Sequence, residues 1–330
     1  MEEYQRQKKA MVIYLSVLGI LALVIIFMAR DFLFDGYTAR HGALVASDGH
    51  QAFVVGGTVS DGDRVSSVYA VDSQNKSIQF IGELDSPLFG CSAVVSKNYG
   101  YVLGGMTKGA FSNVVYQFSL KNKNFKKLTQ LPVSLSFSSA LALNDRLYLM
   151  GGYDGEKRLD SIYCIQPLTG VCQKIGTLPE ARDGGLAVTW KNRLFYIGGE
   201  GADHQRSQEI WEMDPQDGAV LATRKLPENF RPLSAVIYEN QLMILGRGLN
   251  NTHFLLRSSL ESSDAWDPQL TKVPLEPHDA GLAVMDDGLY VIGGSHPRIS
   301  RQLGIWKMES HGQVLRPRRF RSHSWSSSLF

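Results

Sequence analysis

The sequence predicts an all-β fold, a six-bladed β-propeller, preceded by one N-terminal transmembrane helix. Two observations predict the propeller: a unit of 47 or 48 residues occurs six times, and each unit contains a short apolar run that ends in glycine. A third observation, an uncharged apolar run close to the N-terminus, predicts the helix. The chain is therefore expected to be one repeat domain with a membrane anchor.

The glycine pairs, which we call rungs, mark the repeat. Each rung follows an apolar run such as Tyr148–Met150, which is too short for a helix and is therefore expected to be a buried strand. The fifth rung is broken, because Arg247 stands between its two glycines. The rungs are Gly56-Gly57, Gly104-Gly105, Gly151-Gly152, Gly198-Gly199, Gly246-Arg247-Gly248 and Gly293-Gly294.

The fourth unit predicts four antiparallel strands, which together make one blade. They are expected at residues 186–190, 193–197, 209–213 and 219–223, separated by turn-forming residues. An aromatic residue recurs on the third strand of five units, at Tyr69, Tyr116, Tyr163, Trp211 and Trp306. A Leu-Pro or Val-Pro step, which would end the outer strand, recurs at Leu131-Pro132, Leu178-Pro179, Leu226-Pro227 and Val273-Pro274.

These marks resemble those of the kelch-repeat family, over residues 40–320. The apolar strand that ends in Gly-Gly, the later Tyr or Trp, and the segment Pro179-Glu180-Ala181-Arg182 carry the resemblance. It implies a six-bladed kelch-type propeller. Because the last unit contains its own four strands, we expect the ring to close by blade packing, without an exchanged strand, and residues 321–330 to be a C-terminal tail.

Residues 10–29 carry no charge and as a helix would span about 30 Å, the thickness of a bilayer core. A cleaved signal peptide is the alternative, but no convincing small-x-small site follows the run. More basic residues precede the run than follow it closely, which places residues 1–9 in the cytosol. Residues 30–39 would then link the anchor to a periplasmic, extracellular or lumenal propeller.

The cysteines bear on the compartment. Cys164 and Cys172 flank a turn-like segment, and they are expected either to form a disulfide across a hairpin or to be two small buried side chains. Cys91 lies in an apolar stretch and is expected to be an inert buried thiol. The glycosylation sequons at Asn75 and Asn250 would matter only in a host that glycosylates secreted proteins.

Composition excludes several classes of function. The chain has 34 Lys and Arg against 32 Asp and Glu, a net charge of +2, and this balance argues against a nucleic-acid binder. The sequence has no metal-ligand spacing of a known type, no nucleophile elbow and no phosphate-binding glycine loop. We therefore expect neither a metal nor a cofactor.

In a four-stranded meander, the loops after the rungs and the loops between blades lie on the same face. Basic residues gather in these loops, so this face is expected to bind a carboxylate or another anion. The alternative is that these side chains only bond to neighbouring blades and to water. The candidate ligand-binding residues are Arg40, Arg182, Arg231, Arg247, His278 and His296.

One loop, Gly199–Ser207, resembles the post-rung loop of the bacterial sialic acid mutarotases, in which a Glu is followed six positions later by an Arg. Glu200 and Arg206 match that pair. The resemblance implies an isomerase of sugar anomers in which Glu200 serves as acid and base for ring opening. Arg206 would then hold the carboxylate of the sugar.

Three functions follow. The first is a membrane-anchored extracytoplasmic module that binds or assembles with an envelope protein or a glycan. The second is the sugar mutarotase, and the third is an outer structural subunit of a larger membrane complex. A basic cluster of Arg316, Arg318, Arg319 and Arg321 would either contact anionic lipid headgroups or form a solvated tail.

Overall fold

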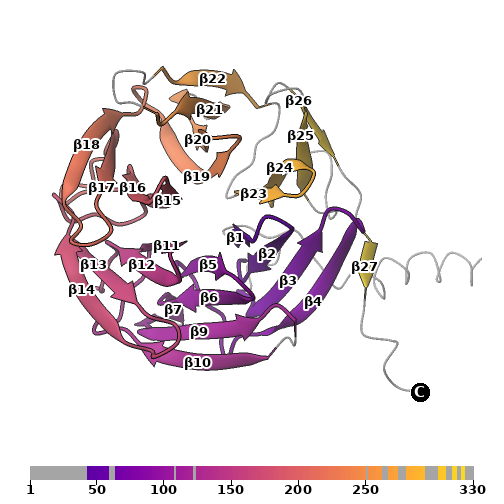
Figure 1. The fold of residues 1–330 in the computed structure, drawn as a ribbon, viewed down its shortest axis with the longest axis horizontal. Coiled ribbons are helices and arrows are strands. Elements are labelled where there is room, and N and C mark those ends of the chain that lie inside the picture. Colours follow the sequence, from indigo (N-terminus) through magenta and orange to yellow (C-terminus); the bar gives the residue numbers. More distant parts are fainter. Residues whose placement is uncertain are drawn as a thin grey trace, which may run out of the picture.

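The computed structural model describes residues 43–58, 64–107, 109–121, 124–249, 252–261, 267–273, 280–293, 304–309, 314–317 and 321–323. Six sheets stand around a common axis, as the view along that axis shows (Figure 1). The predicted six-bladed propeller is therefore confirmed. The helix expected at residues 10–29 lies outside the described residues, and none of the described segments is a helix long and apolar enough to cross a membrane.

Each blade is an antiparallel meander of four strands that runs from the axis outward (Figure 1). The first blade comprises β1 (Leu44–Ser47), β2 (Gln51–Val55), β3 (Ser67–Asp72) and β4 (Ser77–Glu83). The second comprises β5 (Ser92–Ser96), β6 (Tyr99–Leu103), β9 (Val114–Ser119) and β10 (Phe125–Gln130). The third comprises β11 (Ser139–Leu143), β12 (Arg146–Met150), β13 (Ser161–Ile165) and β14 (Cys172–Thr177). The fourth blade comprises β15 (Leu186–Trp190), β16 (Arg193–Ile197), β17 (Glu209–Met213) and β18 (Val220–Lys225). The fifth comprises β19 (Arg231–Tyr238), β20 (Gln241–Arg247), β21 (His253–Ser259) and β22 (Gln269–Lys272). The sixth comprises β23 (Gly281–Met285), β24 (Gly288–Ile292), β25 (Ile305–Glu309) and β26 (Val314–Pro317).

The strand boundaries follow the local sequence signals closely. In the fourth blade the three inner strands have the expected limits, whereas β18 extends two residues further, because its pairing with β17 continues to Lys225. The outer strands β10, β14, β18 and β22 each end directly before the Leu or Val that precedes proline. These four residues are buried: Leu131, Leu178, Leu226 and Val273.

The rungs need glycine for two reasons, which the second blade shows. Gly104 and Gly105 have φ angles of 63° and 99°, a region that L side chains rarely adopt. A Cβ at Gly104 would also lie 2.7 Å from the carbonyl oxygen of Leu135, in the segment that leads into the third blade. At the broken fifth rung, β20 instead continues through Arg247 and pairs with β21 as far as His253.

The apolar core is divided into six clusters, one between each pair of neighbouring blades. At the seam between the sixth and the first blade, for example, Tyr290 and Ile305 pack with Val54 and Tyr69. The recurrent third-strand aromatics belong to these clusters: Tyr69, Tyr116, Tyr163, Trp211 and Trp306. Their role is to hold adjacent blades together.

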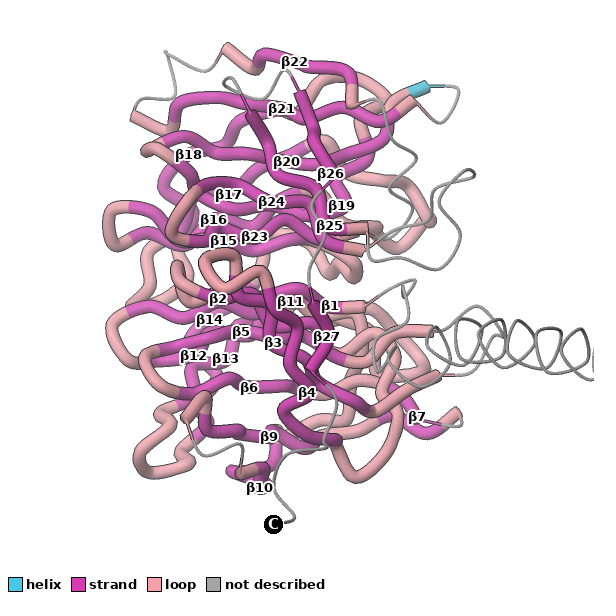
Figure 2. Tube along the Cα trace, turned by 90° about the vertical axis from the view of Figure 1, so that its right-hand side faces the viewer, coloured by secondary structure: helices cyan, strands magenta, loops and turns pink. Residues whose placement is uncertain are grey.

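Each blade has four strands of its own, as expected, but the ring closure includes an additional strand that the sequence did not predict. Residues 321–323, which the sequence assigned to a tail, form β27 (Arg321–His323), and β27 pairs in parallel with β4 at the outer edge of the first blade (Figures 1 and 2). The first blade already has four strands of its own, so β27 is a fifth. An open sheet edge offers unpaired N–H and C=O groups, which is the physical reason for this addition.

The strand register corrects the predicted disulfide. Cys172 on β14 lies opposite Ile165, whereas Cys164 on β13 lies opposite Gln173. Consecutive side chains of a strand point to opposite faces, so Cys164 packs toward the fourth blade and Cys172 toward the second. All three cysteines of the chain are described, and all are free thiols. Burial raises the pKa of the Cys91 thiol to about 12, in keeping with an inert side chain.

We predict that Gly104→Ala destabilises the propeller much more than Gly184→Ala does. Gly184 has a similar φ of 61°, but a Cβ there would meet nothing within 4 Å, so its substitution measures the backbone strain alone. The free energy of unfolding should fall by about 1 kcal/mol for Gly184→Ala and by roughly 3 kcal/mol for Gly104→Ala. Urea unfolding followed by tryptophan fluorescence measures both, and equal losses would show that close packing at the rung is unimportant.

Candidate functional site

The loops after the rungs and the loops between blades lie on one face of the propeller, as expected. In each of the first four blades, the residues after the rung turn back in a short hairpin, closed by the pairs Thr58–Arg64, Met106–Phe111, Tyr153–Arg158 and Glu200–Arg206. The inter-blade loops pair with these hairpins at Phe89–Met106, Ser136–Tyr153 and Asp183–Glu200. We call this side of the molecule, with the rungs, hairpins and inter-blade loops, the rung face.

The returning residue of each of the first three hairpins contacts the next blade. The guanidinium of Arg64 lies over the ring of Phe89, 4.7 Å from its centroid. The ring of Phe111 meets that of Tyr153 edge-on, with centroids 5.8 Å apart. Arg158 reaches carboxylates of the fourth blade. Successive boundaries therefore have the same geometry but different chemistry.

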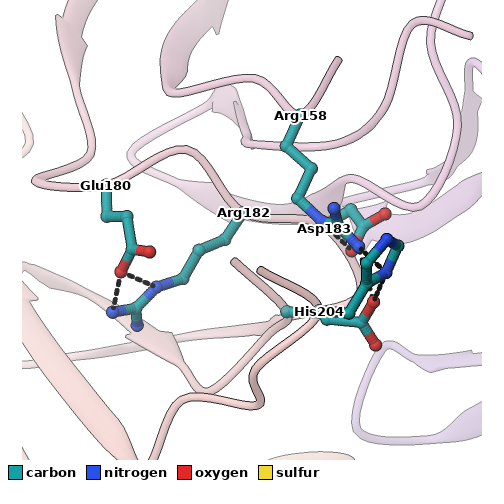
Figure 3. Close-up of polar contacts among 6 residues, drawn as sticks. Arg158, Glu180, Arg182, Asp183 and His204 are labelled. Atoms are coloured by element: carbon teal, nitrogen blue, oxygen red, sulfur yellow. Dashed lines mark hydrogen bonds and ion pairs between the residues drawn. The ribbon is translucent and has the colours of Figure 1, made fainter. Parts of the chain in front are cut away.

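The boundary between the third and the fourth blade carries a charged cluster (Figure 3). Arg158 Nη2 donates to Glu200 Oε1 at 2.5 Å, and Nε donates to Asp183 Oδ1 at 3.3 Å. His204 Nδ1 lies 2.8 Å from the same oxygen of Glu200. The side chains of Arg158 and Asp183 are mostly buried, whereas that of His204 is exposed. One guanidinium thus holds two carboxylates, one of which also contacts an imidazole.

This environment shifts the two carboxylates in opposite directions. The hydrogen bond from His204, supported by the charge of Arg158, holds the pKa of Glu200 below its ordinary value. Burial raises the pKa of Asp183, although Arg158 opposes the shift. Titratable groups whose pKa values are pushed apart are suited to separate acid and base roles. Glu200 is therefore the more readily ionised of the two carboxyl groups, and Asp183 is the more readily protonated.

Arg182 does not face solvent at this site but is bound within the protein. Its guanidinium donates to Glu180 Oε2 at 2.8 Å (Figure 3). It also lies 3.8 Å over the ring of Trp211 and donates to Glu209 Oε2 at 2.8 Å. Arg182 is only 3% exposed. The guanidinium thus bonds the loop between the third and the fourth blade to the fourth blade.

The fifth blade has arginines where the fourth has Asp183 and a rung glycine. Arg231 stands 48 residues after Asp183 and Arg247 stands 48 residues after Gly199, and the two arginines pair directly across β19 and β20. Arg247 also pairs with His253 on β21. Directly opposite residues on adjacent strands project from the same face of a sheet, so these three basic residues form a row.

Arg206 of the fourth blade occupies the place that Arg158 has in the third. Its side chain is exposed and makes no hydrogen bond or ion pair with any of the residues that the structure describes. In the next blade Arg231, directly opposite Arg247, takes the place of Asp183, to which Arg158 donates. Glu200 and Arg206 share a backbone bridge, and Arg206 contributes a small part of the lowering of the Glu200 pKa.

The sequence missed three residues of this region and named three that cannot be placed. Contacts between blades and between strands bring Arg158, Asp183 and His253 into the site. No local sequence pattern marks such contacts. Arg40, His278 and His296 lie outside the described residues. Within the described ranges, no group of three or more His, Cys, Asp or Glu side chains could hold a metal ion.

The comparisons with known proteins agree with this architecture. Residues 40–246 match the family model of the KLHDC2/KLHL20/DRC7 Kelch-repeats domain. The chain belongs to the kelch-repeat family. No curated protein matches this kelch propeller by sequence. Among solved structures, it is similar to the one described as "Structure of YjhT", with a TM-score of 0.67 and 15% identity over 84% of this chain and 98% of that one. That likeness concerns the fold alone.

We predict that His204→Ala raises the pKa of Glu200 toward the ordinary value of about 4.3, because the hydrogen bond from His204 is the main cause of its lowering. Carboxyl-carbon NMR titration measures this pKa, with the Glu200 signal assigned from Glu200→Gln. Arg206→Gln is the control and should shift the pKa less. An unchanged pKa in His204→Ala would contradict the assigned cause.

The same lowered pKa predicts how stability depends on pH. A carboxyl group whose pKa is lower in the folded than in the unfolded state stabilises the fold above the unfolded pKa. The stability advantage of the wild type over Glu200→Gln should therefore be present at neutral pH and disappear as the pH falls through the folded pKa. Urea midpoints measured between neutral pH and about pH 3 test this.

Proposed function

We propose that this kelch propeller is a binding module that recognises an anionic group on the rung face, between the fourth and the fifth blade. One observation carries the proposal: Arg206 has the position of Arg158 but makes no ion pair with a described residue, and in the next blade Arg231 takes the place of Asp183, directly opposite Arg247. Arg206 and Arg247 are like charges, and an anion that accepts hydrogen bonds from both would offset the repulsion between them.

The chemistry of the site favours a carboxylate or another oxyanion. A guanidinium presents N–H donors in a planar fork that matches two oxygen atoms, and Arg206 is exposed and has no ion pair within the described structure. Arg247 is half-buried on β20, where the backbone ladder fixes its position. An acidic side chain of an envelope protein and an acidic sugar of a glycan both supply such a group.

We also infer that residues 10–29 anchor the protein in a membrane, with residues 1–9 in the cytosol and the propeller on the other side. Ala43 lies against Gly57, so the described chain begins on the rung face. The linker of residues 30–39 spans at most about 3.5 Å per residue, which keeps that face close to the membrane. The partner would then be a membrane or envelope molecule, either a bound ligand or a larger complex in which this chain is a structural subunit.

We predict that Arg206→Glu and Arg247→Glu together weaken retention of anionic partners by about tenfold or more, because each reversal replaces an attraction by a repulsion. The full-length chain in detergent would be immobilised and exposed to solubilised envelope proteins and to matched glycans with and without a carboxylate. Arg146→Glu, an exposed position on β12, is the control. Equal retention by all variants, or no preference for acidic partners, would contradict the proposal.

A sugar mutarotase is the second candidate, and the opposed pKa shifts of Asp183 and Glu200 favour it. In ring opening a base takes the proton of the anomeric hydroxyl, the bond from the anomeric carbon to the ring oxygen breaks, and an acid protonates that oxygen. Ionised Glu200 suits the base and Asp183 suits the acid, while Arg206 would hold a carboxylate of the sugar. The reverse steps close the ring with either configuration.

This activity predicts faster anomer exchange of freshly dissolved sialic acid, followed by one-dimensional NMR, when the full-length protein is added. Glu200→Gln should remove the acceleration, because the amide cannot accept the proton. Arg146→Gln, which changes a charge outside the site, should leave it intact. No acceleration, or an acceleration that survives Glu200→Gln, would exclude the enzyme for this sugar and leave the binding module.

A further inference from the structure

A pocket lies between the fourth and the fifth blade and opens at the end opposite the rung face. It has a volume of about 370 Å³, and its walls come from the turn between β15 and β16, from β17 and β18, and from the end of β21. In β15 and β16, Leu186 and Ile197 pair next to the rung, whereas Trp190 and Arg193 pair at the far end. The principal lining residues are Trp190, Lys191, Glu212, Arg224, Leu260 and Glu261.

Arg224 is the central feature of this pocket, because it is buried and poorly satisfied. It is only 5% exposed, and Nη1 donates to Glu212 Oε2 at 2.9 Å. The buried Nε has no hydrogen-bond partner, and no other described residue accepts from this guanidinium. A guanidinium carries five N–H donors, and buried donors without acceptors are costly. The pocket is therefore lined by a cationic side chain that has fewer acceptor oxygens around it than N–H donors.

Arg182 shows that this deficit does not follow from burial alone. It lies in the preceding inter-blade interface and is similarly buried, yet its donors reach Glu180, Glu209 and the carbonyl oxygen of Gly198. The unsatisfied Arg224, by contrast, lines a pocket. The difference indicates that the donors of Arg224 are left for a ligand.

The outer part of the pocket is formed by the ring of Trp190, which the side chain of Lys191 covers. Lys191 Nζ lies 4.3 Å from the ring centroid of Trp190 and 2.5 Å from Glu261 Oε2. Lys191 and Glu261 are more than half exposed, and ion pairs of this kind are weak. A flat ligand can therefore displace Lys191 from the face of Trp190 at little cost. The buried Leu260 adds an apolar wall.

We propose that this pocket binds a small aromatic monocarboxylic acid. Its carboxylate accepts hydrogen bonds from Arg224, and its flat apolar body packs on Trp190. Of the three cationic side chains of the lining, Lys191 pairs with Glu261 and Arg193 pairs with Asp214, whereas Arg224 has free donors beyond its bond to Glu212. Those donors match one carboxylate, while the nearby Glu212 disfavours a dianion such as phosphate. The volume is at the lower end of the range of about 300–1,000 Å³ for ligand sites.

Isothermal titration calorimetry on the full-length protein tests this, with indole-3-acetate, its neutral analogue indole-3-acetamide and inorganic phosphate as probes. The acid should bind at least about tenfold more tightly than the amide, and phosphate should bind more weakly than the acid. Arg224→Met should weaken binding of the acid about tenfold, whereas the control Arg146→Gln should not change it. Equal binding of acid and amide, preferred binding of phosphate, or no binding at millimolar concentration would overturn the proposal.

Two milder variants decide the matter if Arg224→Met does not fold. Glu212→Gln replaces the carboxylate that competes for the guanidinium by a neutral amide, a weaker acceptor, so it should tighten binding of indole-3-acetate. Lys191→Ala uncovers the ring of Trp190 and should tighten binding of the acid and the amide alike. If neither variant changes affinity for the acid, the ligand does not occupy this pocket and the proposal fails.

Discussion

The packing of each blade against its neighbours is the constraint on which the rest of this structure depends. A four-stranded blade cannot bury its own apolar faces, and the described core consists of six clusters that lie between blades. Close approach of the chain to the next blade requires glycine at the rungs, as at Gly104. Recurrent aromatics such as Trp211 fill the spaces that remain. The contacts between neighbouring blades therefore recur along the chain as regularly as the strands do.

The same constraint creates the polar sites. The boundaries between blades share one geometry. Equivalent side chains of successive blades therefore face equivalent positions of the next blade, and the residue at that position differs from one unit to the next. Arg158 meets two carboxylates and forms a closed cluster, while Arg206 meets a blade in which Arg231 takes the place of Asp183. The buried Arg182 and Arg224 differ similarly, because Arg182 has several acceptors and Arg224 has Glu212. Among the described residues, Arg206 and Arg224 thus lack the acceptors that their counterparts in the preceding interface have.

Closure of the ring uses additional bonds beyond the apolar packing of the first and the sixth blade. The amide of Val284 donates to Ser47 Oγ at 3.2 Å, and His50 Nδ1 lies 2.5 Å from Asp286 Oδ1. The strand β27, which follows the sixth blade in the chain, pairs with the outer strand β4 of the first. The seam is therefore joined by bonds at the inner strands and by an added strand at the outer edge, which offsets the loss of covalent continuity there.

The sequence by itself determined the number of blades, the limits of most strands and the face that carries the loops, because glycine, proline and strand periodicity act locally and recur at a fixed spacing. It also placed Glu200 and Arg206 in one loop of that face. Only the tertiary structure decided that Arg158 and Asp183 join Glu200, that β27 completes the seam and that Cys172 faces away from its expected partner. Each of these outcomes depends on register or on a contact between residues of different blades, which no local pattern specifies.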